Sequence, residues 1–304
     1  MTILLDVILP VLLVAGVAAL AQPFLRLDVR SISRVAFYLF APALVFDSLA
    51  HSSVGGAEYA QIAAVLLLTT AVLWVLGEVA ARLLRLEGPV RSAFLLTLLL
   101  MNAGNYGLPV TQFAFGDDGL ARAVLFLTVS ATLSASLGVY LAARGRASAW
   151  LALRRVAGVP MVYAAALGLI FNLFHLTLPD PLLKAVRLLG QATVPVFLVV
   201  LGIQLAQTFR AKRHPLHLPA LTVVAVGRLC LAPALALALA WALGLHGLTR
   251  SVVVLESATP TAVVSTILAT EFDADPSFVT LCVFVTTIAS MVTVTLWLTL
   301  IGLM

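Results

Sequence analysis

Hydrophobic residues fill long stretches of this 304-residue chain, and short polar connections separate them. A helix needs about 20 apolar residues to cross the hydrocarbon core of a bilayer. Measured against that length, the pattern predicts ten membrane-spanning helices. They lie near residues 3–21, 34–50, 60–84, 91–115, 119–142, 157–176, 182–208, 218–243, 249–271 and 276–302. The sequence therefore predicts an all-α, polytopic membrane protein.

Polar, helix-breaking residues interrupt two of these stretches. Residues 102–109 read Asn-Ala-Gly-Asn-Tyr-Gly-Leu-Pro, and residues 256–260 read Glu-Ser-Ala-Thr-Pro. The backbone groups freed by such a break cannot hydrogen-bond to lipid, so a break persists only where it lines a protected cavity. The two breaks therefore indicate a transport site. The alternative is a pair of proline kinks that serve helix packing alone.

Composition supports the membrane class. The chain is 62% hydrophobic and 10% charged, and its mean hydropathy of +1.13 exceeds what the core of a soluble protein requires. It contains no Gly-x-Ser-x-Gly, no His-Glu-x-x-His and no P-loop motif, which argues against an intramembrane enzyme and against direct ATP drive. We expect no cofactor other than a coupling ion.

Cations are distributed unevenly among the connections. Thirteen of the eighteen Lys and Arg residues fall in four alternate connections, near residues 26–34, 82–91, 144–155 and 210–213. Short connections rich in Lys and Arg stay in the cytoplasm. Because these four are the first, third, fifth and seventh connections, both termini are predicted to face outward. The basic segment 143–156 is predicted to be a cytoplasmic linker that lies on lipid headgroups, and no nucleic-acid partner is expected.

Three proline pairs suggest an internal repeat. They are Pro10 and Pro160, Pro42 and Pro195, and Pro109 and Pro260, which lie 150, 153 and 151 residues apart. Five spans is an odd number, so a second copy must enter the membrane the opposite way up. The predicted organisation is thus one five-helix repeat over residues 1–142 and a second, inverted repeat over residues 157–304.

The broken helices have ends of opposite polarity. The N-terminal end of each outgoing half offers free N–H groups to an anion, and the C-terminal end of each incoming half offers carbonyls to a cation. The first break adds the side chains of Asn102, Asn105 and Tyr106. The second adds Glu256, Ser257, Thr259 and Thr261, an oxygen-rich set that suits Na⁺ or a titrating proton and does not suit zinc.

Ionisable residues inside the spans have several interpretations. Arg228 lies deep in the stretch 218–243, where a charge is costly. It would contact a substrate carboxylate, balance Glu256, or form a purely structural ion pair. Glu78 stands four residues before Arg82, which is the helical spacing of an ion pair. Gln204 is expected to make a hydrogen bond between packed helices.

The Asn-x-x-Asn-Tyr-Gly-Leu-Pro break, together with the ten stretches, resembles the auxin efflux carrier family, which is grouped with the bile-acid/sodium symporters. The resemblance implies that spans four and nine cross near the membrane midplane at Pro109 and Pro260, with Asn102 and Asn105 facing the substrate. It also implies a scaffold of spans one, two, six and seven, often dimeric, and a mobile unit of the other six. Glu256 is reminiscent of the sodium-binding acid of the bile-acid symporters.

The long hydrophilic centre of the plant exporters is absent, so the chain resembles a prokaryotic member whose cargo need not be auxin. We therefore expect a secondary transporter in a prokaryotic plasma membrane that carries a small organic anion, auxin-like or dicarboxylate, coupled to sodium or protons. The alternatives are a ligand-gated channel, a membrane-embedded sensor, or an intramembrane enzyme. Expected substrate contacts are Asn102, Asn105, Tyr106, Pro109, Pro260, Thr261 and Arg228; expected ion contacts are Glu256, Ser257 and Thr259.

Overall fold

The computed structural model describes residues 4–52, 54, 56–143, 148–209 and 217–302. All of its regular elements are helices. The described residues also contain one isolated β-bridge. In the first half they are η1 Leu4–Ile8, α1 Leu9–Leu25, α2 Val29–Val35, η2 Ala36–Phe40, α3 Ala41–Ala50, α4 Gly56–Leu83, α5 Gly88–Leu99, η3 Ala103–Gly107, α6 Leu108–Leu133, η4 Ser134–Gly138 and α7 Val139–Ala142. The elements labelled η are single wide turns of π-helix.

The second half contains the same kinds of element. They are α8 Ala149–Ala157, α9 Pro160–Leu173, α10 Asp180–Gln191, α11 Thr193–Phe209, α12 Leu218–Val226, η5 Gly227–Leu231, α13 Ala232–Ala242, α14 Gly247–Ser257, α15 Val264–Glu271 and α16 Pro276–Gly302. All ten predicted stretches are thus largely helical. The predicted linker 143–156 differs, because α8 occupies its second part. Arg144, Arg146, Arg210, Lys212 and Arg213 of the predicted basic connections lie outside the described residues.

The all-helical, polytopic membrane fold is confirmed. Seven helices of the described chain are long and apolar enough to cross a membrane, or up to eight if α8 and α9, bent by 57° to each other, form one span. The predicted stretch 249–271 is not among them because it is broken. The longest of the seven, 103–142, contains Gly116 with φ 64° and ψ −158°. Glycine tolerates this conformation, which divides α6 into two helical pieces.

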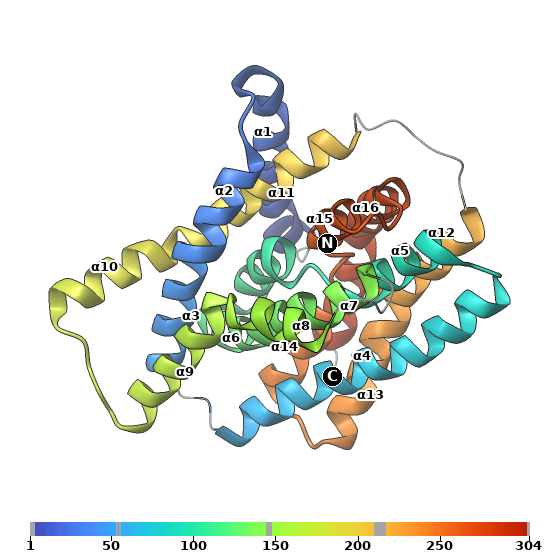
Figure 1. Ribbon diagram of the computed structural model, residues 1–304. Helices are drawn as coiled ribbons and strands as arrows, with labels where there is room; N and C mark the ends of the chain where they lie inside the picture. The colour runs from blue at the N-terminus through green and yellow to red at the C-terminus, as the bar shows by residue number, and fades with distance from the viewer. Residues whose placement is uncertain (1–3, 53, 55, 144–147, 210–216, 303–304) are drawn as a thin grey trace.

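Two groups of helices pack around the centre of the molecule (Figure 1). In the first group α1 lies on α11, and α3 lies on α9 and α10. Small residues bring these backbones together. A Cβ added at Gly202 of α11 would collide with the carbonyl oxygen of Ala15 in α1, and one added at Gly168 of α9 would lie 3.0 Å from Leu49 Cβ in α3. We call this set, with α2, the first helix group.

The second helix group contains α4, α5, α6, α12, α13, α14, α15 and α16. Within it, α6 and α13 each pack on both α4 and α14, and α5 packs on α4 and α16. The two groups meet where α11 contacts η3 and α6, and where α3 contacts α6. Residues of both breaks therefore lie in or beside the contact between the two groups.

Candidate functional site

The two predicted breaks are both present, and they contact each other. α5 ends at Leu99 and α14 ends at Ser257, and each is followed by a short non-helical segment. Met101 and Thr261 form an antiparallel β-bridge. The Asn102 amide donates to the Pro260 carbonyl at 2.8 Å, and the Ala262 amide donates to the Leu100 carbonyl at 2.9 Å. Each segment thus supplies hydrogen-bond partners to backbone groups that the break leaves unpaired in the other segment. We call residues 100–102 and 258–263 the crossing.

Threonine hydroxyls hold the crossing together. Thr261 Oγ1 donates to the Thr97 carbonyl at 2.8 Å, and the Thr261 amide donates to Thr286 Oγ1 on α16 at 3.1 Å. Thr259 Oγ1 donates to the Glu256 carbonyl at 2.6 Å. All of these residues are fully buried. The hydroxyls of Thr259 and Thr261, both predicted to contact ligands, therefore bond to backbone carbonyls in this structure.

The outgoing half of the first broken helix begins earlier than predicted. The sequence predicts a break over residues 102–109, whereas the helix resumes at Ala103 as the wide turn η3 and continues into α6. The Gly107 amide bonds to the Asn102 carbonyl at 2.9 Å, a spacing of five residues. Pro109 has no N–H to donate, and its ring clashes with the carbonyl four residues before it, so a wider turn relieves the clash.

Glu256 is fully buried at the end of α14. Its Oε1 accepts a hydrogen bond from Thr111 Oγ1 at 2.8 Å, and its Oε2 has no partner among the described residues. The carboxylate lies against η3, because a Cβ added at Gly107 would overlap it. This close approach explains why position 107 is glycine.

Arg228 is fully buried on η5, between α12 and α13. Its guanidinium donates to three backbone carbonyls: Nη2 to Ser257 at 2.7 Å, Nη1 to Leu98 at 3.1 Å and Nε to Thr259 at 3.3 Å. Among the described residues it forms no ion pair with Glu256, so of the three alternatives for Arg228 the structure gives no support to a direct pair with this carboxylate. These bonds also give no support to a substrate contact at Arg228.

Two asparagines of the first break differ in their partners. Asn102 is 5% exposed, and its Nδ2 has no hydrogen-bond partner among the described residues. Asn105 Nδ2 donates to Gln204 Oε1 on α11 at 3.3 Å, which links the two helix groups as expected of Gln204. Tyr106 is buried beside Val110 in the core that joins α1, α6 and α16.

The comparisons with known proteins decide the family. A family model described as a membrane transport protein matches residues 3–151 and 146–298. The chain belongs to the auxin efflux carrier family of membrane transport proteins. It is similar to an uncharacterised transporter of Methanothermobacter thermautotrophicus, with 31% identity over 89% of this chain and 88% of that protein. It is also similar to an uncharacterised transporter of Methanocaldococcus jannaschii, with 26% identity over 96% of this chain and 97% of that protein.

Membership in the auxin efflux carrier family makes the protein a membrane transporter and not an enzyme. Among the described residues, no group of three or more His, Cys, Asp and Glu side chains is arranged to hold a metal ion. The chemistry at the crossing therefore consists of amides, hydroxyls, one carboxylate and one guanidinium.

Sequence reasoning missed several residues of this transporter's centre. Thr111, the partner of Glu256, lies two residues after Pro109, and Thr286 belongs to a different helix altogether. The pattern offered one signal for Thr111: it lies four residues after Gly107, on the same helix face. No local signal points to Thr286, because its contact with Thr261 arises only from the packing of α16 on the crossing.

A polar cavity of about 320 Å³ lies between the helix groups, away from the crossing. Asp47 of α3 pairs there with His51 at 3.0 Å and with Arg187 of α10 at 3.4 Å. Gln112, Asp117, Asp118 and Arg122 of α6 line the opposite wall. None of the crossing residues lines this cavity, so it is a polar space between the groups that is separate from the breaks.

Proposed function

We propose that this auxin efflux carrier family member is a secondary active transporter that carries a small organic anion, a mono- or dicarboxylate, by alternating access. The observation that carries the proposal is the Nδ2 of Asn102, a buried amide donor that has no partner among the described residues and lies where the two broken helices meet. A buried donor left unbonded is costly, so it calls for an acceptor from outside the protein. A carboxylate supplies such an acceptor.

The helix that begins at Ala103 favours the same ligand. Its first N–H groups face away from the helix body, and its N-terminal end carries a partial positive charge that attracts anions. Asn105 adds an amide whose present acceptor is Gln204, at the long distance of 3.3 Å. A carboxylate bound by Asn102 and Asn105 would replace this weak bond with charge-assisted ones.

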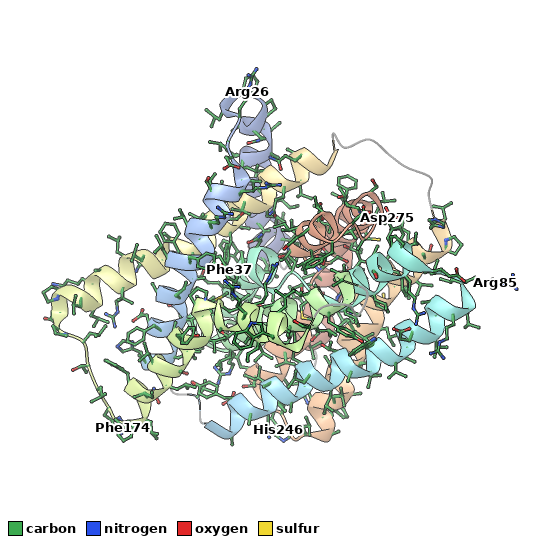
Figure 2. All side chains as sticks on the ribbon, viewed as in Figure 1. Arg26, Phe37, Arg85, Phe174, His246 and Asp275 are labelled. Atoms are coloured by element: carbon green, nitrogen blue, oxygen red, sulfur yellow. The ribbon has the colours of Figure 1, made fainter. Side chains whose placement is uncertain are left out.

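The proposed topology has ten crossings of the membrane, with both termini outside and an inverted repeat of five helices. In Figure 2, Arg26, Arg85 and Asp275 lie toward the upper and right side of the molecule, and Phe174 and His246 lie along its lower side. These labels mark connections that the proposal assigns to opposite membrane faces. The packing of α1 on α11, matched by that of α9 on α3, also fits a two-fold relation between the halves.

The proposed movement is of the second helix group against the first. The crossing belongs to the second group, and the Asn105–Gln204 bond joins it to α11 of the first group. The polar cavity between α3, α10 and α6 supplies solvated space along the same boundary. An anion that binds one arrangement more tightly than the other would shift the equilibrium by that difference in affinity.

Glu256 is the proposed site of ion coupling, with Ser257 and Thr259 beside it. Its Oε2 and the Ser257 hydroxyl are both buried and without partners among the described residues. An unbonded carboxylate oxygen offers a place for a proton or a monovalent cation. Loading this site would change the charge against η3, which presents the N-terminal end of the helix proposed to hold the anion.

Binding and uptake by purified protein in proteoliposomes test the proposal. Probes are indole-3-acetate, succinate and malate, with sodium and proton gradients imposed separately. We expect Asn102→Ala and Asn105→Ala to weaken binding of the transported acid at least tenfold while the protein remains folded. Gln207→Ala, which removes an exposed amide from α11, is the matched control and should bind normally. Unchanged affinity in both asparagine variants would reject the proposed site.

Counterflow separates a carrier from a channel. Vesicles loaded with unlabelled acid should accumulate labelled acid transiently against its gradient if alternating access operates. A channel would equilibrate the label without accumulation. In the same assay, Glu256→Gln should remove the dependence of uptake on the driving ion gradient, and an unaltered dependence would argue against coupling at Glu256.

A further inference from the structure

Eight carbonyl groups at the ends of the two incoming half-helices already have partners within the protein. An incoming half-helix ends in carbonyls that lack intrahelical donors, and transporters commonly use such ends to bind a coupling cation. Here the donors belong to the chain itself. The bonded carbonyls are Leu96, Thr97, Leu98 and Leu100 at the end of α5, and Glu256, Ser257, Thr259 and Pro260 at the end of α14.

Arg228 is the charged member of this set of donors. It bonds to Leu98 at the end of α5 and to Ser257 and Thr259 at the end of α14, so one guanidinium joins both incoming half-helices. Each helix C-terminus carries about −0.5 elementary charge, so two ends that converge present about one negative charge. An arginine side chain is always protonated and matches that charge.

The backbone around Arg228 favours this close approach. Arg228 follows Gly227, and a Cβ added at Gly227 would lie 2.5 Å from Leu98 Cδ1. The absence of a side chain at position 227 thus lets η5 lie close to the end of α5. Arg228 is fully buried, and a buried charge this deep in a membrane protein requires partners that offset its desolvation.

We propose that Arg228 is a resident cation that occupies the carbonyl ends of both broken helices and takes the place of a bound monovalent cation there. Arg228 is then a positioning residue, since it holds the two half-helices in register without touching the cargo. For coupling, the inference rests on the proposed function: Glu256 is left as the site for a proton, because the carbonyls of Leu98, Ser257 and Thr259 are bonded to Arg228 and are not free to hold sodium.

Thermal unfolding of the purified protein in detergent tests the inference without knowledge of the substrate. The wild type should melt at the same temperature in sodium chloride and in choline chloride of equal ionic strength. Arg228→Ala should melt roughly 5–10 °C lower, because three carbonyls lose their donor. Low-millimolar methylguanidinium should restore part of this loss, and Arg228→Lys should lie between the wild type and Arg228→Ala.

Arg122→Ala is the matched control. Arg122 is a partly buried arginine that bonds to Glu58 at 3.0 Å and to Thr249 at 2.7 Å. The Arg122→Ala variant is expected to lose stability, and methylguanidinium should not restore it, because the site of Arg122 is not formed by the carbonyl groups of helix C-termini. Equal recovery of both variants would show a general solvent effect and would overturn the inference.

Two further outcomes would overturn it. The first is sodium-specific stabilisation of the wild type that Glu256→Gln abolishes, because this would demonstrate that a sodium ion binds at the crossing while Arg228 is present. This measurement stands even if Arg228→Ala does not fold. The second is an Arg228→Met variant that melts with the wild type. Neither depends on transport, so a failure of uptake in proteoliposomes would count against the proposed function and leave these results unchanged.

Discussion

Replacement of Gly107 by alanine tests how closely η3 packs on Glu256. A Cβ at position 107 would overlap the Glu256 carboxylate. Gly104 belongs to the same wide turn, and a Cβ there would lie 3.4 Å from Leu127 Cδ1 and 3.5 Å from Phe197 Cε2, which are ordinary van der Waals distances. Gly104→Ala is therefore the matched control for the change of helix propensity.

The expected magnitude follows from these contacts. Both substitutions gain up to about 1 kcal/mol from the better helix propensity of alanine. Gly107→Ala also loses about 1–3 kcal/mol through overpacking. If the carboxylate moves far enough to lose its bond from Thr111, a further loss of about 1.5–3 kcal/mol follows, as for a hydrogen bond to a charged group. We expect Gly107→Ala to be less stable than Gly104→Ala by roughly 1–6 kcal/mol.

The assay is thermal unfolding in detergent, extended to a double-mutant cycle. Glu256→Ala removes the group that the new methyl would meet. The variant that combines Gly107→Ala with Glu256→Ala should therefore lose less stability than the sum of the two single changes. Equal melting temperatures for Gly107→Ala and Gly104→Ala, or additive losses in the cycle, would refute the close contact between η3 and the carboxylate.

Three other predictions concern single interactions. Thr111→Val removes the hydrogen bond to the buried Glu256 carboxylate at nearly constant shape, and the free energy of unfolding should fall by about 1–3 kcal/mol in thermal or denaturant melts; no change would mean that the bond is absent in solution. Two hydrogen bonds lower the pKa of Asp28 below its usual 3.8: the larger effect comes from the Ser31 hydroxyl and the smaller from the Arg30 amide. The stabilisation by this N-cap charge is thus present above pH 3.8 and is lost as the pH falls through the lowered pKa, so wild type and Asp28→Asn should differ in melting temperature near neutrality and converge in acid. Arg155 pairs with Glu271 at the exposed end of α15, and Arg155→Ala should change stability by less than about 1 kcal/mol, with any difference vanishing in high salt; a larger loss would show that α8 is held on α15 by more than this pair.

Local pattern predicted much of the architecture because membrane helices follow from hydrophobicity and length. The helical stretches, the membrane class and the positions of both breaks were all readable from residue order. The detail within the first break was not, because the restart at Ala103 depends on how the chain accommodates Pro109 in three dimensions. Likewise, residues 143–156 are predicted as a linker from their basic side chains, and the structure shows that the helix α8 begins within them at Ala149.

Charge partners were predicted poorly. Helical spacing pointed from Glu78 to Arg82, whereas the structure pairs Glu78 with Arg91 of α5 and with Trp74. An ion pair four residues apart on a helix is worth only about 0.2–0.5 kcal/mol. A partner brought near by the turn between α4 and α5 therefore competes easily, and residue spacing alone cannot rank the two.

The sequence by itself determined that this chain is a helical membrane protein and that two of its helices break at polar, proline-containing segments. Both conclusions follow from the properties of lipid, which solvates apolar side chains and cannot form hydrogen bonds with unpaired backbone groups. Only the tertiary structure decided which groups satisfy those breaks: Met101 against Thr261, Thr111 on Glu256 from 145 residues away, and Arg228 on three carbonyls. Such partners depend on the packing of distant helices, whose rotation and depth no local pattern contains.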